Sequence, residues 1–258
     1  MLRFLFPFLI FGFSTTAKAS GGFTWIGSIS HSLGIHVPEH ILTFAFVGIL
    51  LALVGLIYRA QISKVSNVVI PDKTISVRNI TELYGQFIYS QCKAVLGEKE
   101  AAKYYTFIAT TFIVIFVSNF IGLIPGFLPP TENLSTTLAL GAFAFIYYNY
   151  KGCQELGTVN YIKHFAGPMP ALALLIFPIE ILSNFIRPVS LALRLRGNMM
   201  GDHKVLEVFS GLAPLIVPIV FMMLGLLVCF IQAYVFTMLT MVYIALATAH
   251  HDHEEHAH

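Results

Sequence analysis

The C-terminal part of this chain is apolar over a very long stretch. Residues 213–249 contain no Asp, Glu, Lys, Arg or His, and Gln232 stands near their middle. A soluble domain usually has about 25% charged residues, whereas this 258-residue chain has 11%, with 57% hydrophobic residues and a mean hydropathy of +0.78. These values exclude a cytosolic enzyme and an intrinsically disordered protein. They indicate an all-α protein that crosses a membrane several times.

The charge balance and the cysteines exclude further classes. A formal net charge of +2 is too small for a nucleic-acid-binding surface, so we expect no nucleic-acid partner. Cys92, Cys153 and Cys229 are odd in number and far apart. This spacing fits neither a disulfide framework nor a zinc site.

The first 19 residues have the pattern of a secretory signal peptide. Arg3 precedes an apolar run at residues 4–13, and Ala-Lys-Ala at residues 17–19 has the form of a cleavage site. The run is shorter than the roughly 20 residues that a spanning helix needs. An uncleaved interfacial segment is the alternative. Residues 20–40 are expected to form a periplasmic N-terminal segment.

Five apolar segments are expected to cross the bilayer within an integral membrane domain at residues 41–249. The last two would each be about 60 Å long as helices, although the hydrocarbon core is only about 30 Å thick. We therefore predict that they form a strongly tilted hairpin, with its turn near Gly211 and Pro214. The five segments are residues 41–58, 106–124, 134–150, 171–212 and 213–249.

The distribution of basic residues predicts the orientation. Seven Lys and Arg residues lie between the first two spans, and Lys151 and Lys163 follow the third, whereas residues 20–40 and 125–133 have none. The positive-inside rule then places the N-terminus outside and the C-terminus in the cytoplasm. We expect a multi-pass protein of the cell inner membrane. The amphipathic residues 77–103 are predicted to form one helix on the cytoplasmic surface.

A polar stripe runs along the fourth span. Glu180, Arg187 and Arg194 follow each other at seven-residue steps and therefore share one helix face. A charge at the membrane centre costs about 2.5–3.5 kcal/mol on insertion scales, so it indicates a function. Glu180 and Arg194 would be about 21 Å apart along a helix, too far to pair directly. The other polar residues near this face are Ser183, Asn184, Ser190, Asn198 and Asp202.

At four positions of the fourth span, a purely structural role competes with a functional one. Arg187 lies toward the cytoplasmic end, and we interpret it as snorkelling to lipid headgroups. Arg196 points to nearly the opposite side of the helix, so it either pairs with another helix or lines an aqueous cavity. Ser183 and Ser190 either line a cavity or hydrogen-bond to the backbone or a neighbouring helix.

Two long motifs resemble the signature of subunit a of bacterial F-type ATP synthase. They are Arg187-Pro-Val-Ser-Leu-Ala-Leu-Arg-Leu-Arg-Gly-Asn-Met-Met-Gly-Asp-His203 and Ile231-Gln-Ala-Tyr-Val-Phe-Thr-Met-Leu-Thr-Met-Val-Tyr-Ile244. Residues 118–125 and 130–135 are also similar to this family, and the resemblance covers roughly residues 75–249. It implies an ion-translocating, non-catalytic stator subunit of the F0 sector that couples ion flow, with H⁺ as the expected ion, to ATP synthesis.

The resemblance also implies roles for individual residues. Arg194 corresponds to the arginine that faces the carboxylates of a rotating c-subunit ring, and its charge is permanent. Asn198 and Gln232 correspond to the neutral polar residues beside it. Glu180 is assigned to the inner half-channel. His203, which titrates near neutral pH, is assigned to the outer one, with a simple interfacial histidine as the alternative.

Two positions depart from the family pattern. Gly225 stands where the family commonly has a His or Glu, so His203 lacks a relay partner there, and Asp202 is the candidate substitute. Arg196 stands where the family often has an aromatic residue, and the sequence assigns it no role.

The implied partners are the c-subunit ring, b-type peripheral stalk subunits, the F1 sector through the holoenzyme, and the lipid bilayer. A stand-alone ion channel or transporter is the alternative function. An intramembrane enzyme is disfavoured, because the spans contain no paired-acid, Ser/Lys or His-rich metal pattern. We expect no cofactor. The His-rich tail at residues 250–258 is expected to be solvated, and we assign no metal to it.

Overall fold

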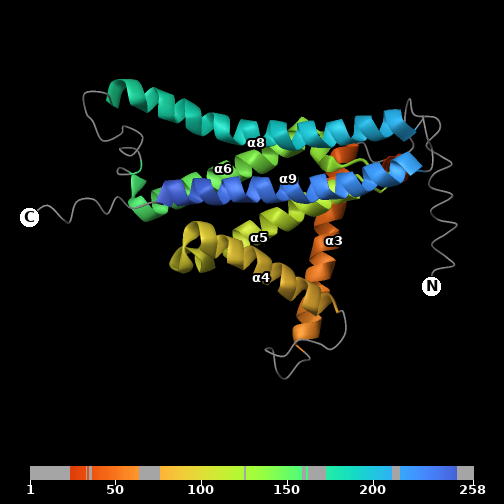
Figure 1. Ribbon diagram of the computed structural model, residues 1–258, viewed down its shortest axis with the longest axis horizontal. Helices are drawn as coiled ribbons and strands as arrows, with labels where there is room; N and C mark the ends of the chain where they lie inside the picture. Colours follow the sequence, from red (N-terminus) through yellow and green to blue (C-terminus); the bar gives the residue numbers. More distant parts are fainter. Residues whose placement is uncertain are drawn as a thin grey trace, which may run out of the picture.

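The computed structural model describes residues 24–32, 34, 37–63, 76–124, 126–158, 161, 173–210 and 216–248. Within these ranges the chain forms helices and short connections, without a β-strand (Figure 1). The helices are α2 (Trp25–Ser32), α3 (Glu39–Ile62), α4 (Val77–Leu96), α5 (Glu98–Ile121), the 3-10 helix η1 (Pro130–Glu132), α6 (Leu134–Leu156), α8 (Ala173–Ser210) and α9 (Ile216–Thr248). The predicted signal peptide, hairpin turn and His-rich tail lie outside the described residues.

Four helices have the length and composition of membrane spans. They are α3, α5, and most of α8 and α9, and they correspond to four of the five predicted spans. The remaining predicted span, residues 134–150, lies within the continuous helix α6, which is not among the four. The helical fold of the described residues is thus confirmed, and the count of five spans stays a prediction.

The prediction of one helix at residues 77–103 is confirmed for residues 77–96 and wrong beyond them, because the segment contains a helix boundary. α4 ends at Leu96, where Gly97 adopts a φ of 82° that favours glycine and stops the helix. Glu98 and Glu100 then begin α5, where acidic side chains stabilise the positive end of the helix dipole. The last six residues of the predicted surface helix therefore lengthen the helix of the second span.

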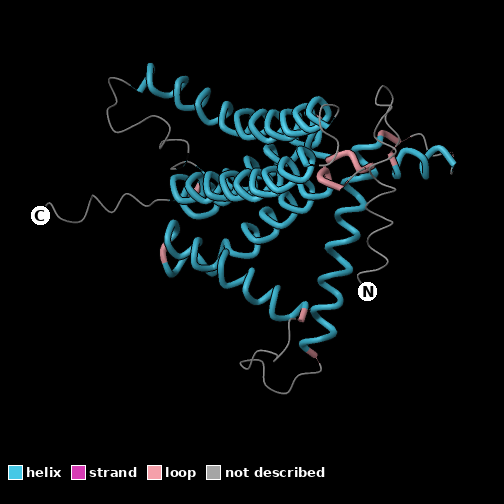
Figure 2. Tube along the Cα trace, turned by 45° about the vertical axis from the view of Figure 1, so that its right-hand side comes forward, coloured by secondary structure: helices cyan, strands magenta, loops and turns pink. Residues whose placement is uncertain are grey.

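α8 and α9 pack side by side, run in opposite directions, and cross the direction of α3 (Figures 1 and 2). α8 continues through Pro178 and Pro188, although a proline removes one N–H from the helix. Pro188 leaves the carbonyl of Asn184 without its usual donor, and the Tyr148 hydroxyl lies 3.5 Å from that oxygen. α6 can lie close to α8 at Pro188 because Gly141 has no side chain. A Cβ at Gly141 would lie 2.7 Å from the carbonyl oxygen of Pro188.

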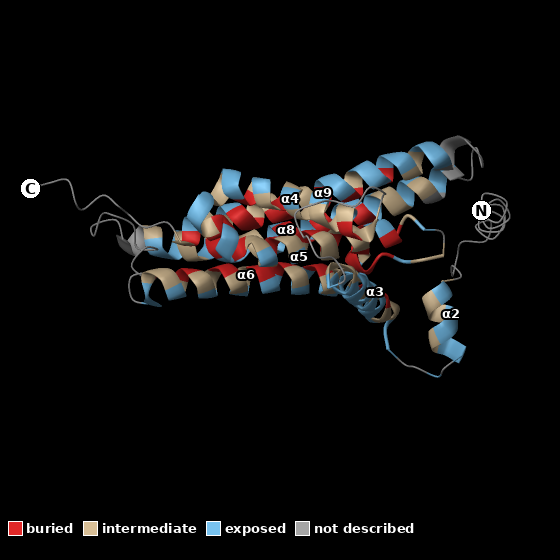
Figure 3. Ribbon diagram, turned by 90° about the horizontal axis from the view of Figure 1, so that it is seen from below, coloured by how far each residue is buried: buried red, intermediate tan, exposed pale blue. Residues whose placement is uncertain are grey.

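The buried core lies between α5, α6, α8 and α9, with α4 along its edge (Figure 3). Its fully buried large side chains include Tyr104 and Ile108 of α5, Leu195 of α8, and Phe236 and Ile244 of α9. The outer faces of α3 and α8 are rich in exposed Ile, Leu, Val and Phe. Such faces suit contact with lipid or with other membrane helices.

Candidate functional site

α8 turns one face into the protein and the other outward. Arg194 lies on the outward face, one turn after Ser190 and one turn before Asn198, and all three are exposed. The buried residues of the opposite face include Leu191, Ala192, Leu195 and Met199. Within the described part of the chain, Arg194 has neither a hydrogen bond nor an ion pair. A charge on the exposed face of a spanning helix is costly unless a partner or water compensates it.

The amides of Asn198 and Gln232 connect α8 to α9. The Asn198 Nδ2 donates to the Gln232 Oε1 at 2.6 Å. Gln232 is buried, whereas Asn198 is exposed, so this bond runs from the outward face into the helix pair. The structure thus brings together the two amides that the sequence assigned to the neighbourhood of Arg194.

Glu180 and Arg187 form an ion pair near the start of α8, with 3.5 Å between Oε1 and Nη2. The Arg187 guanidinium also lies 5.1 Å from the centroid of the Tyr243 ring. Arg187 therefore has a carboxylate and an aromatic ring of the same chain as partners, and its assignment to lipid headgroups stays a prediction. The Glu180 side chain remains 42% exposed, and Ser183, one turn further on, is half-buried.

A polar network behind this ion pair joins α6 to α8. The Tyr148 hydroxyl donates to Asn184 Oδ1 at 2.7 Å, and Asn184 Nδ2 donates to Asn149 Oδ1 at 3.1 Å. The Tyr161 hydroxyl donates to the same Asn149 oxygen at 2.8 Å. Sequence reasoning found Asn184 but not its partners Tyr148 and Asn149, since no local pattern marks which α6 side chains turn toward α8.

His203 is held from two sides near the other end of α8. Its Nε2 lies 2.9 Å from the carbonyl oxygen of Gly122. Its Nδ1 lies 3.3 Å from Glu132 Oε2, close enough for an ion pair but not aligned as a hydrogen bond. Because a carbonyl oxygen only accepts, Nε2 carries a hydrogen. When the ring is neutral, the lone pair of Nδ1 faces the negative carboxylate and the two repel each other. The contact is attractive only when a proton is bound to Nδ1 or to the carboxylate.

Glu132 is the residue of this site that sequence reasoning missed. It belongs to η1, which is fixed to the end of α5 because the Thr131 hydroxyl donates to Asn119 Oδ1 at 2.7 Å in a buried contact. His203 beside it holds the pKa of Glu132 below its usual range, with smaller contributions from Lys204 and Arg196, against the opposing effect of burial. One feature of the sequence could have identified it: Glu132 is the only charged residue of the predicted outer loop at residues 125–133.

Several buried polar atoms in the same region have no hydrogen-bond partner among the described residues. They belong to α5, η1 and α8, and they are Ser118 Oγ, Asn119 Nδ2, Glu132 Oε2, Arg196 Nε and Asp202 Oδ2. An unsatisfied buried polar atom costs about 1–3 kcal/mol. Buried water usually satisfies such groups in proteins, so the surroundings of Glu132 suit water and ion entry.

Gly225 is a packing position in this structure. A Cβ at Gly225 would lie 2.6 Å from Leu123 Cδ2, so a larger residue could not fit without movement of the leucine. The acidic neighbour of His203 comes from η1 and not from α9. Among the described residues Asp202, the candidate substitute, makes no hydrogen bond or ion pair with His203, whereas Glu132 lies 3.3 Å from it.

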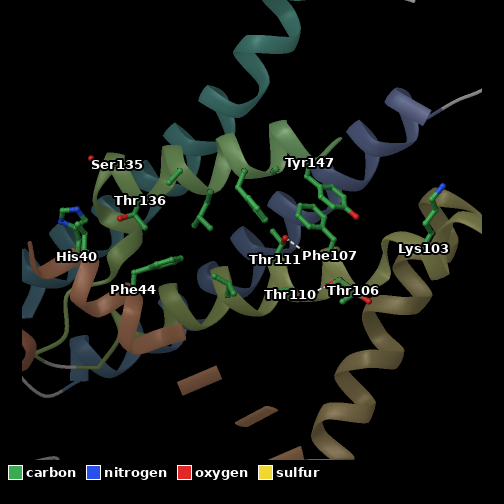
Figure 4. A pocket seen from close by; sticks show the side chains of 16 residues that line it. His40, Phe44, Lys103, Thr106, Phe107, Thr110, Thr111, Ser135, Thr136 and Tyr147 are labelled. Carbon is green, nitrogen blue, oxygen red and sulfur yellow. Dashed lines mark hydrogen bonds between the residues drawn. The ribbon is translucent and has the colours of Figure 1, made fainter. Parts of the chain in front are cut away.

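A separate apolar groove of about 830 Å³ lies between α3, α5 and α6 (Figure 4). Polar side chains mark its two ends, with Lys103 at one and His40 at the other, and Phe107 stacks on Tyr147 along its wall. None of its lining residues comes from α8 or α9. The groove therefore opens on a different face from Arg194.

Together these features define a multi-pass helical membrane protein with ionisable side chains along one spanning helix. The family model described as ATP synthase A chain matches residues 41–245. A relative from Bdellovibrio bacteriovorus, named ATP synthase subunit a, is 44% identical over 218 residues, which are 84% of this chain and 94% of the relative. Relatives of the same name from Aliarcobacter butzleri and Sorangium cellulosum are 41% and 37% identical, covering 91% and 90% of this chain and 98% and 90% of their own. The chain belongs to the ATP synthase subunit a family.

Proposed function

We propose that the chain is the ion-translocating stator subunit of an F0 sector, and that it supplies two half-channels to a rotating c-subunit ring. The observation that carries this proposal is Arg194, which is exposed in an apolar helix face and has no partner among the described residues. A ring carboxylate passing this face meets a permanent positive charge, which favours release of its proton. The subunit conducts ions and performs no covalent chemistry.

The outer half-channel is formed around His203 and Glu132. Nδ1 of His203 and the Glu132 carboxylate can exchange one proton, while Nε2 stays hydrogen-bonded to the carbonyl oxygen of Gly122. Water at the unsatisfied atoms of Asn119 and Asp202 would deliver that proton. The pair lies about 13 Å beyond Arg194 along α8.

The inner half-channel begins at Glu180, on the other side of Arg194. Its partly exposed carboxylate can exchange protons with the cytoplasm, and Arg187 keeps it oriented. Ser183 and the amide of Asn184 continue the polar path along α8. Arg194 stands between the two half-channels and obstructs direct passage of protons from one to the other.

The arrangement of the spans supports the proposed hairpin tilt. α8 has 38 residues and is therefore about 57 Å long, against a hydrocarbon core of about 30 Å. With α3 upright, α8 and α9 lie steeply inclined, because they run across it (Figure 1). The groove between α3, α5 and α6 faces away from the ring and supports docking of b-type stalk subunits there.

Reporter fusions test the orientation. We expect fusions at Lys73, Lys163 and the C-terminus to report cytoplasm, and a fusion at Glu132 to report the outside, because basic connections stay inside. A cytoplasmic signal at Glu132 would contradict the five-span arrangement and the outer position of the His203 pair.

Thiol labelling tests the two half-channels. We expect cysteines replacing His203 to react with a membrane-impermeant reagent added outside, and cysteines replacing Glu180 to react from the cytoplasm. The natural cysteines are replaced by serine first, and a cysteine at the buried Leu195 provides the unreactive control. The reverse pattern of access would overturn the assignment.

Reconstitution tests the function itself. F0 assembled with its ring should conduct protons in liposomes, whereas the purified chain alone should not, since ions reach the far half-channel only by way of a ring carboxylate. Rapid conduction by the chain alone would favour the stand-alone channel.

A further inference from the structure

Arg196 belongs to neither of the proposed half-channels. It follows Arg194 by two residues and lies on the other side of α8, since two residues turn a helix by about 200°. His203 follows Arg196 by seven residues, close to two full turns, so the two side chains share the inner face of α8. That face also carries the buried Met199.

Arg196 lies on the same face of α8 as His203, the residue that contacts Glu132. The Nε of Arg196 is buried and has no hydrogen-bond partner among the described residues, and Oε2 of Glu132 is buried in the same way. The packing of η1 on α8 brings the two charges into electrostatic contact, where Arg196 helps to hold the pKa of Glu132 low. An arginine whose Nε is buried without a hydrogen bond is costly unless an anion compensates its charge.

We propose that Arg196 is a positioning residue of the outer half-channel: its fixed charge keeps Glu132 ionised, so that the transferable proton is taken up by His203. This inference rests on the proposed function of the His203 pair. Arg196 lies about 10 Å from His203 along the helix, and the ring cannot neutralise it because it faces inward. It thus complements Arg194, which acts on the ring.

The other ionisable groups near Glu132 are few. α8 contributes Asp202, His203 and Lys204, and α3 contributes His40, whose ring lies 3.3 Å from the Asn133 amide. Cys229 of α9 is near Asp202. The titratable residues of α5 lie in its first eight residues, and those of α6 lie in its second half, both far along the chain from η1.

The test is the pH profile of passive proton flux through the assembled F0 sector, for Arg196→Phe, Arg196→Gln and Arg196→Lys. The acid limb of this profile is the pH range in which flux falls as Glu132 takes up a proton. Removing the charge of Arg196 lets Glu132 take up that proton at higher pH, so the acid limb should move up by about one pH unit in the Phe and Gln variants. Arg196→Lys keeps a charge and should keep the acid limb near its normal position. The amount of assembled chain is measured in each membrane, and flux is expressed per assembled complex.

The same substitutions in a Glu132→Gln background identify the group that responds. There, Arg196→Phe should no longer move the acid limb, because the carboxyl that it controls is gone. An acid limb that stays in place in both neutral variants, or that still moves in the Glu132→Gln background, would overturn the inference. If Glu132→Gln alone left flux unchanged, the proposed outer half-channel itself would be wrong.

Discussion

Replacing Arg194 by alanine is expected to abolish ion-driven ATP synthesis, with a loss of roughly 100-fold or more, while the complex still assembles. Losses of this size are typical when one preorganised charge is removed from a reaction site. Arg194 is exposed and makes no contact that supports the fold of the described chain, so assembly should survive. ATP synthesis by membrane vesicles and passive proton flux are measured together, and the flux should persist or rise because the barrier between the half-channels is lost.

Arg194→Lys should fail as well, although it keeps a charge. A lysine can lose its proton when it is desolvated, and it lacks the planar guanidinium. Arg59→Ala is the matched control, since Arg59 is an exposed arginine near the end of α3 and far from the stripe. Arg196→Phe should retain substantial coupled synthesis at neutral pH, because it acts on Glu132 and not on the ring. A coupled Arg194→Ala variant beside a dead Arg196→Phe variant would show that α8 faces the other way.

Glu132→Gln and His203→Ala are each expected to slow proton flux through F0 by about ten- to a hundredfold at neutral pH, within or below the usual range for loss of a positioned acid–base group. The amide introduced at position 132 can donate to Nδ1 of His203. It would fix that nitrogen as an acceptor and remove the transferable proton. The flux remaining in Glu132→Gln should shift toward acid pH, because no carboxylate then stabilises the charged imidazole.

The double variant shows whether the two residues act as one unit. Glu132→Gln combined with His203→Ala should be no slower than His203→Ala alone, because each change breaks the same relay. Additive losses would indicate two independent groups and would return His203 to the interfacial alternative. Asn133→Ala serves as a neighbouring control, since Asn133 contacts His40 and the backbone of Ser135 but not His203.

Hydropathy and helix periodicity determined much of this protein. The apolar segments predicted five spans, and four of them coincide with helices long and apolar enough to cross a membrane, because a charge-poor stretch of this length has few other solutions. A helix places residues seven apart on one face, so the stripe through Glu180 and Arg194, and the opposite orientation of Arg196, could be predicted from numbering alone. The Arg-Leu-x-Gly-Asn motif then identified the family.

The tertiary structure decided which side chains meet across different segments. Glu132 and His203 are 71 positions apart, and they meet because the Thr131–Asn119 hydrogen bond fixes η1 against α5 and beside α8. Periodicity describes one helix at a time, so it cannot say which loop covers the inner face of α8. For the same reason the sequence did not identify Tyr243 as a neighbour of Arg187. The outward part of the site, around Arg194, could thus be predicted from the sequence of one helix. Its inward part, around His203 and Glu132, forms only when η1 packs against α8.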